Sequence, residues 1–279
     1  MLRFVNANQK SAFTNKEKQM SNKKPLILAD LSWPEVAAIR DDVDVVLIPV
    51  GSNEQHGPNL SLSMDITGAT QFCIKASEIA YPKLLVAPSM PWGVSHHHMN
   101  FPGTITLTSD TFIQILVEVV ASLQEHGFKR FMIINGHGGN MAPLGDAIVR
   151  INEELEPDFI GSGLYLYFAD DGINEQFGID GIIGHACEWE TSVAMYLAPE
   201  IVKTDALAAG EMTDLTYNFR TTMQKYKVNV PWRFDRYTTN GALGDARRSS
   251  VEYGKAVIDS ALKNFVEFME EVVVQSPTQ

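Results

Sequence analysis

Side chains that could do chemistry gather in one short segment near residue 50. Gly51 to Asp65 reads GSNEQHGPNLSLSMD and carries Glu54, His56 and Asp65 directly after an apolar run. Alternate residues of an extended segment point to the same side, so Glu54 and His56 can converge while Gln55 faces away. Two carboxylates and an imidazole form a ligand set that suits zinc or manganese. The alternative is a solvated loop that carries these residues by chance.

A second segment places a histidine after a predicted strand. Phe131 to Asn140 reads FMIINGHGGN. Glycines on both sides of His137 allow a tight turn and leave the imidazole unshielded, as a ligand or catalytic group requires. A phosphate-cradling turn is the alternative, but the chain lacks the Walker Lys-Ser/Thr pair and the GxGxxG spacing here. We therefore favour His137 as a ligand.

The third segment, Gly184 to Ser192, reads GHACEWETS and precedes an apolar helical pattern. A helix that begins here leaves His185 in the preceding loop and puts Glu188 in or near the first turn, where a carboxylate suits the helix dipole. Helix capping would explain Glu188 and Glu190 but not His185. The three segments together indicate a metal site and are compatible with two metals.

In this order, the segments resemble the creatininase family of metal-dependent amidohydrolases, whose members share GSxEQHGxxLxxxxD, NGHxxN and HAGxxETS. The resemblance also takes in GVSHHHMNFPGTITL (Gly93 to Leu107), which is similar to the family's GxSxxHxxFPGTxxL, and GALGD (Gly241 to Asp245). It spans roughly residues 26 to 270. Its order and spacing make a chance match improbable.

The resemblance implies a binuclear centre of two divalent ions per chain, zinc or manganese, with iron as a further option. Glu54, Asp65 and His137 would hold one ion, and His56 and Asp65 the other, with Asp65 as the bridge. In creatininase itself the last carboxylate comes from the NGHxxN segment. This chain has Gly139 there.

Two glutamates of the third segment are candidates to replace that carboxylate. Glu188 stands where creatininase carries an apolar residue, so we predict that Glu188 is the ligand. Glu190 matches the glutamate of the ETS motif. We predict that it does not bind the metal itself but orients a ligand or a histidine by contacting it from outside the ligand set. Cys187 stands where the family usually has glycine, and a thiolate beside the metals is a further alternative.

The implied reaction is attack of a metal-activated hydroxide on an amide-type carbon. His185 is predicted to move a proton to the departing nitrogen, because a neutral imidazole donates and accepts near pH 7; a structural histidine is the alternative. His98 matches the family's histidine ahead of FPGT. Within the run from His96 to His98, we predict that His98 alone is a pocket residue.

Apolar strands alternate with amphipathic helices along the chain. This alternation predicts one α/β domain with a mainly parallel sheet and helices on both faces. The predicted strands are 43–50, 84–88, 128–134 and 159–168, and the predicted helices are 66–79, 110–126, 142–154 and 249–274. Ligands bind such sheets beyond the carboxyl ends of the strands. Glu54, His56 and His137 come directly after predicted strands and so lie at that end.

Composition is consistent with one enzyme domain. A chain of 279 residues with 45% hydrophobic content can bury a sizeable core, so we predict a disordered extension over 1–24 and the hydrolase domain over 25–279. Two distant cysteines, no signal peptide and no membrane-length run favour the cytoplasm. A net charge of −12 argues against nucleic acid.

The substrate is less well defined. Creatininase stacks its flat substrate against tryptophans just ahead of HAGxxETS, whereas this chain has none between Trp92 and Trp189, so creatinine is not favoured. Leu164 to Phe168 and Phe177 are pocket candidates, with strand core as the alternative. We predict an amidohydrolase for a small cyclic amide, formamide or similar molecule. The alternatives are a peptidase of a cofactor-maturation pathway and a non-catalytic metal-binding protein on the same fold.

The resemblance also implies a homohexamer. Large apolar residues flank the histidine run in a predicted loop, and such residues usually mark an interface. The alternative is a lid that folds over the metal site. The residues are Met90, Pro91, Trp92, Met99, Phe101 and Pro102.

Overall fold

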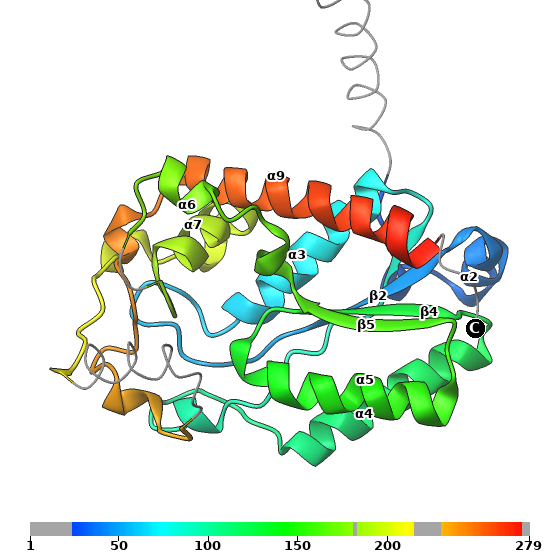
Figure 1. Ribbon diagram of the computed structural model, residues 1–279, viewed down its shortest axis with the longest axis horizontal. Helices are drawn as coiled ribbons and strands as arrows, with labels where there is room; N and C mark the ends of the chain where they lie inside the picture. Colours follow the sequence, from blue (N-terminus) through cyan, green and yellow to red (C-terminus); the bar gives the residue numbers. More distant parts are fainter. Residues whose placement is uncertain (1–23, 181–182, 215–229, 275–279) are drawn as a thin grey trace, which may run out of the picture.

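A five-stranded, all-parallel sheet runs through the centre of the computed structural model, which describes residues 24–180, 183–214 and 230–274 (Figure 1). The strand order is β1-β3-β2-β4-β5. Every residue of the central strand β2 is buried, as expected where helices cover both faces. The strands are β1 (Leu26–Ile27), β2 (Val45–Val50), β3 (Leu84–Val86), β4 (Arg130–Asn135) and β5 (Phe159–Leu164).

Helices form a layer on each face of the sheet (Figure 1). One layer contains α3 (Met64–Ile79), α7 (Glu188–Leu197) and α9 (Val251–Phe268), and the other contains α4 (Ser109–Glu125) and α5 (Met141–Leu155). The remaining helices are α2 (Trp33–Ile39) and the short α6 (Ile173–Gln176). Among the helices described here, none combines the length and apolar character needed to cross a membrane.

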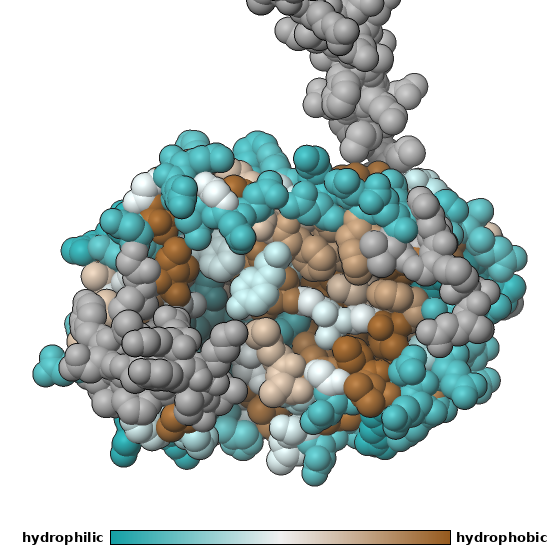
Figure 2. Space-filling view, viewed as in Figure 1, coloured by the Kyte–Doolittle hydropathy of each residue, from teal (hydrophilic) through white to brown (hydrophobic). Residues whose placement is uncertain are grey.

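Alternate residues of β2 belong to two separate apolar clusters, one on each face of the sheet. Leu47 belongs to the cluster that contains Phe72 of α3 and Phe265 of α9, whereas its neighbour Ile48 belongs to the cluster that contains Phe112 of α4. This follows from the period of two along a strand. Figure 2 shows hydrophilic side chains along the outer surfaces of both layers and apolar side chains gathered between them, towards the edge strand β5.

The predicted α/β class and mainly parallel sheet are confirmed, with three local differences. The strand predicted over 159–168 ends at Leu164, because Tyr165–Phe168 forms a 3-10 helix whose Tyr165 and Leu166 are buried in the core. The terminal helix changes to π-helix over Met269–Val274. The strand β1 and helix α2 were not predicted. The extension predicted for 1–24 lies outside the described residues except Lys24.

Two glycines let the start of α3 lie against the ends of β2 and β4. A Cβ atom on Gly136 would lie 2.1 Å from the carbonyl oxygen of Asp65, and one on Gly51 would lie 2.4 Å from the backbone nitrogen of Ile66. Real Cβ atoms do not approach so closely, so neither position accepts a side chain without movement of α3. The backbone of Asp65 is therefore fixed by direct contact with the strand ends.

We predict that Gly136→Ala shifts Asp65, with a loss of about 1–3 kcal/mol in unfolding free energy and a loss of about 10- to 100-fold in metal affinity. Urea unfolding and metal titration measure these effects. The matched control is Gly145→Ala in α5, where no atom lies within 4 Å of the added methyl group and a gain of about 0.4–1 kcal/mol is expected. Wild-type metal affinity in Gly136→Ala would contradict the proposed packing role.

Candidate metal centre

A cavity of about 310 Å³ opens beyond the carboxyl ends of β2 and β4. Its lining combines acids, histidines and two aromatic side chains, drawn from segments that are far apart in the sequence. The residues that line it are Glu54, Asp65, His97, His98, His137, Gly138, Gly139, Gly184, His185, Glu190, Phe234, Tyr237 and Leu243.

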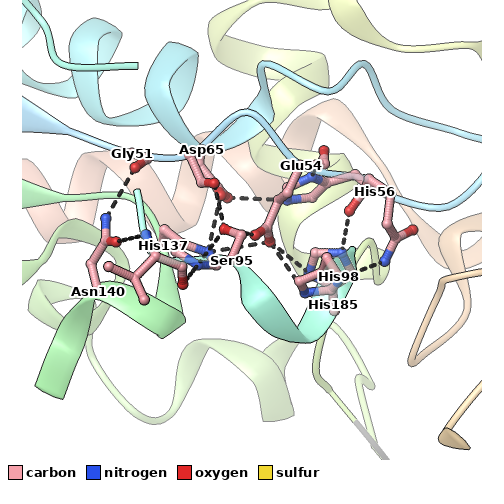
Figure 3. Close-up of polar contacts among 12 residues, drawn as sticks. Gly51, Glu54, His56, Asp65, Ser95, His98, His137, Asn140 and His185 are labelled. Atoms are coloured by element: carbon pink, nitrogen blue, oxygen red, sulfur yellow. Dashed lines mark hydrogen bonds and ion pairs between the residues drawn. The ribbon is translucent and has the colours of Figure 1, made fainter. Parts of the chain in front are cut away.

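Glu54 lies at the centre of a group of histidines (Figure 3). Its Oε1 atom is 3.2 Å from His137 Nδ1, 3.4 Å from His98 Nε2 and 3.8 Å from His185 Nδ1. Its Oε2 atom accepts a hydrogen bond from the Ser95 hydroxyl at 2.6 Å. The carboxylate is 1% exposed, so these groups replace its hydration.

Asp65 faces two histidines with its two oxygens. Oδ1 lies 3.0 Å from His56 Nε2, and Oδ2 lies 3.1 Å from His137 Nδ1 (Figure 3). Both His56 Nε2 and Asp65 Oδ2 are buried and lack a partner in hydrogen-bonding geometry, despite these short distances. Buried polar atoms without such a partner are uncommon, and bound ions are one explanation. The donor set therefore fits metal ions, with Asp65 able to serve two.

In both His56 and His137, the ring nitrogen that faces away from Asp65, here called the outer nitrogen, contacts a main-chain carbonyl. His56 Nδ1 donates to the carbonyl of Glu54 at 3.1 Å, and His137 Nε2 donates to the carbonyl of Val94 at 3.2 Å. A carbonyl only accepts, so the outer nitrogen carries a proton in each ring. The nitrogen that faces Asp65 is then the one available to a metal.

The structure does not place Glu188 with the other predicted ligands. Its Oε2 accepts from the backbone nitrogen of Asp245 at 2.7 Å, and its Oε1 lies 3.7 Å from Arg248. Glu190, two residues further along α7, lines the cavity instead. Residues two apart on a helix face different directions, so only one of the two glutamates can reach the centre. In this geometry Glu190 is the better placed of the two to be the ligand, and the choice between them stays a prediction.

Glu190 is well placed to contribute a ligand. Its ligand atom and those of His56 and His185 all lie within 4.8 Å of one another, and its Oε2 also accepts from the backbone nitrogen of Ala186 at 2.6 Å. The packing disfavours a carboxylate at position 139, because a Cβ there would lie 2.4 Å from the main-chain oxygen of Val94 as well as 2.4 Å from His137 Nε2.

Of the remaining predicted residues, the two histidines lie at the cavity, whereas the cysteine is not favoured as a ligand. His98 and His185 line the cavity as expected, but His97 does so too, with its ring stacked on that of His137 at 5.6 Å. Cys187 is buried, and burial raises the pKa of its thiol to about 12, so a thiolate ligand is not favoured.

Two aromatic residues of the cavity were not predicted. Phe234 lies 4.2 Å from the ring of His98 and 4.9 Å from that of His185, and Tyr237 lies beside it. The predicted pocket candidates lie elsewhere: Tyr165 is in the core, and Phe177 packs on Tyr253. Neither Phe234 nor Tyr237 belongs to a motif, so no sequence signal pointed to them.

When no metal is bound, the mutual attraction of Asp65 with His56 and His137 keeps these three groups charged. Burial alone would lower the pKa of His56, but the Asp65 carboxylate raises it to about 10. Burial would raise the pKa of Asp65, yet His56 and His137 hold it below its usual value. For Glu190, burial outweighs the effect of His56 and raises the pKa to about 7. For His185, burial and then His56 lower the pKa to about 3, so in the metal-free protein its ring is neutral at pH 7 and is a weaker base than the free imidazole on which its predicted role was based.

Comparison with known proteins shows the family. The sequence profile described as "Creatininase: Creatinine amidohydrolase" matches residues 29–269, and the chain belongs to the creatininase family. It is 32% identical over 196 residues to the mycofactocin precursor peptide peptidase of Mycobacterium ulcerans, which covers 68% of this chain and 72% of the relative. It is 25% identical to the creatinine amidohydrolase of Pseudomonas putida, over 89% of this chain and 97% of the relative.

Solved structures show the same fold. A manganese form of creatininase matches with a TM-score of 0.76 and 25% identity, over 90% of this chain and 99% of that one. A creatinine amidohydrolase homologue from Bacteroides fragilis has a TM-score of 0.78 at 22% identity, over 92% of this chain and 99% of that one. The chain is therefore a creatininase-family hydrolase with a cluster of residues that can bind metal.

We predict that zinc binding to the metal-free protein releases protons near pH 7. Because the pKa of His56 is raised to about 10 and that of His137 is also raised, both rings carry an inner proton that a metal must displace. Metal affinity should therefore fall as the pH falls. Calorimetric zinc titrations in buffers of different ionisation enthalpy measure the release, and His56→Gln should release about one proton fewer. Heats independent of the buffer would contradict the prediction.

Proposed function

We propose that this protein is a binuclear metal-dependent hydrolase that cleaves an amide-type carbon–nitrogen bond. The observation that carries the proposal is the position of Asp65, whose two oxygens face different histidines at 3.0 and 3.1 Å. Glu54 and His137 complete one ligand set around Asp65, and His56 and Glu190 complete the other. Two divalent ions held there would activate water and polarise a carbonyl.

The histidines beside this centre suit proton transfer. His185 Nε2 donates to the carbonyl of Gln55 at 2.6 Å, which leaves Nδ1 facing the cavity, 3.8 Å from Glu54 Oε1. In the proposed reaction, His185 Nδ1 takes a proton from the attacking water and passes it to the departing nitrogen. The aromatic ring of Phe234 packs beside the rings of His98 and His185, and both histidines are buried.

A small amide is the proposed substrate class. A cavity of about 310 Å³ is at the lower end of the range for small-molecule sites. One related creatininase structure is a complex with creatine, which supports a small planar ligand. The aromatic residues of this cavity, Phe234 and Tyr237, come from the segment after residue 230. The creatininase pocket instead uses tryptophans ahead of the HAGxxETS segment. We therefore expect the substrate to differ from creatinine.

A peptide amide is the second candidate. The relative that is 32% identical is a peptidase, and its identity is higher than that of the creatinine amidohydrolase. A screen of cyclic amides, formamides and short peptides with the zinc- and manganese-loaded protein separates the two classes. Hydrolysis of none of these by a fully metal-loaded protein would favour a metal-binding protein without catalytic activity.

We also propose that the chain forms a homo-oligomer, with the hexamer as the expected form. None of the six apolar residues predicted to form an interface or a lid lines the cavity, and Trp92 and Met99 are 47% and 42% exposed. This arrangement favours an interface over a lid. Light scattering tests it, and a species of 30.9 kDa, the mass of one chain, would exclude it.

The two ligand sets lead to a matched pair of variants. Glu190→Gln should reduce the bound metal from two ions to about one per chain, because a neutral amide is a poor ligand for these ions. Glu188→Gln, two residues away in the same helix, should keep both ions. Asp65→Asn should weaken both sites, because both depend on its carboxylate. Elemental analysis after gel filtration measures the ions, and circular dichroism checks the fold. Full metal content in Asp65→Asn would contradict the bridging role.

A further inference from the structure

Gln55 contacts two histidines of the cavity with two different groups. Its side-chain Nε2 lies 2.9 Å from His98 Nδ1, and its main-chain carbonyl lies 2.6 Å from His185 Nε2. Gln55 itself is 5% exposed and belongs to neither proposed ligand set. It stands in the sequence between the ligands Glu54 and His56.

The orientation of the Gln55 amide is fixed by two backbone partners. Its Oε1 accepts from the backbone nitrogen of Gly57 at 2.9 Å, and its Nε2 donates to the carbonyl of Gly241 at 3.0 Å. A flipped amide would set N–H against N–H and oxygen against oxygen. The group that faces His98 is therefore the amide N–H.

These contacts determine where each histidine carries its proton. His98 Nδ1 must accept from Gln55, so the proton of the neutral ring is on Nε2, which points towards Glu54 Oε1 at 3.4 Å. His185 Nε2 must donate to a carbonyl, so its Nδ1 faces the cavity with a lone pair. The two rings lie 4.6 Å apart with opposite tautomers.

We propose that Gln55 is a positioning residue that holds His98 and His185 in opposite tautomers. This inference rests on the proposed function for its consequence, which is a division of roles in the cavity. His98 presents an N–H that can donate to a substrate carbonyl oxygen, and His185 presents the lone pair that accepts a proton. Although the ligand atoms of Glu54, His98 and His185 are close enough to hold an ion, the inward N–H of His98 prevents it from being a ligand.

Nitrogen-15 NMR of the histidine-labelled, zinc-loaded protein tests this assignment, because protonated, bare and metal-bound ring nitrogens have distinct shifts. We expect a proton on His98 Nε2, a bare His98 Nδ1 and a proton on His185 Nε2. In Gln55→Glu, the carboxylate only accepts, so the His98 proton should move to Nδ1. In Gln55→Met, which offers neither a donor nor an acceptor, both His98 tautomers should be populated.

His185 serves as the internal control, because the main-chain carbonyl that sets its tautomer is unchanged in both variants. The proposal is overturned if wild-type His98 carries its proton on Nδ1, if its Nε2 binds zinc, or if Gln55→Glu leaves its tautomer unchanged. The wild-type spectrum decides the first two points even if the variants do not fold. Zinc content in the same samples separates the claims: fewer than two ions with the expected tautomers contradicts the binuclear centre but not the role of Gln55.

Discussion

The structure of the site depends on the contact between Asp65 and the two histidines on either side of it. Asp65 reaches this position because it lies in the first turn of α3, which packs against the glycine-containing ends of β2 and β4. His56 follows β2 and His137 follows β4, and these two strands are neighbours in the sheet. A parallel sheet therefore brings both histidines to one edge, and the start of α3 supplies the carboxylate between them.

This arrangement costs stability unless the buried charges are compensated. None of the four charged groups, Glu54, Asp65, His56 and His137, is more than 4% exposed. Without ions, the carboxylates and the protonated rings neutralise one another, and removal of one partner would leave an unpaired buried charge, at a cost of about 3–5 kcal/mol. Bound ions would displace the ring protons that face the carboxylates and would then neutralise these carboxylates in their place. This mutual neutralisation lowers the cost of burying the cluster when no metal is bound.

Much of the site could be predicted from the sequence because its chemistry follows strand ends. Glu54, His56 and His137 come directly after apolar strand patterns, and all three lie at the cavity or beside it. The sequence does not show which of Glu188 and Glu190 faces the cavity, because that depends on the rotation of α7 and on the backbone nitrogen of Asp245, 57 residues away from Glu188 in sequence.

The aromatic side of the cavity was also beyond sequence reasoning. Phe234 reaches His98 and His185 through a long-range contact that has no local pattern. The role of Gln55 was hidden for a related reason. The sequence analysis expected Gln55 to face away from Glu54 and His56, whereas in the packed structure its side chain contacts His98, a ring that Glu54 also faces.

The most direct test of the proposed binuclear centre is anomalous diffraction from crystals of the zinc-loaded protein, recorded on both sides of the zinc absorption edge. We expect two peaks per chain, one on each side of the Asp65 carboxylate, with His137 and Glu54 at one and His56 and Glu190 at the other. A single peak, or a second peak held by Glu188 in place of Glu190, would contradict it.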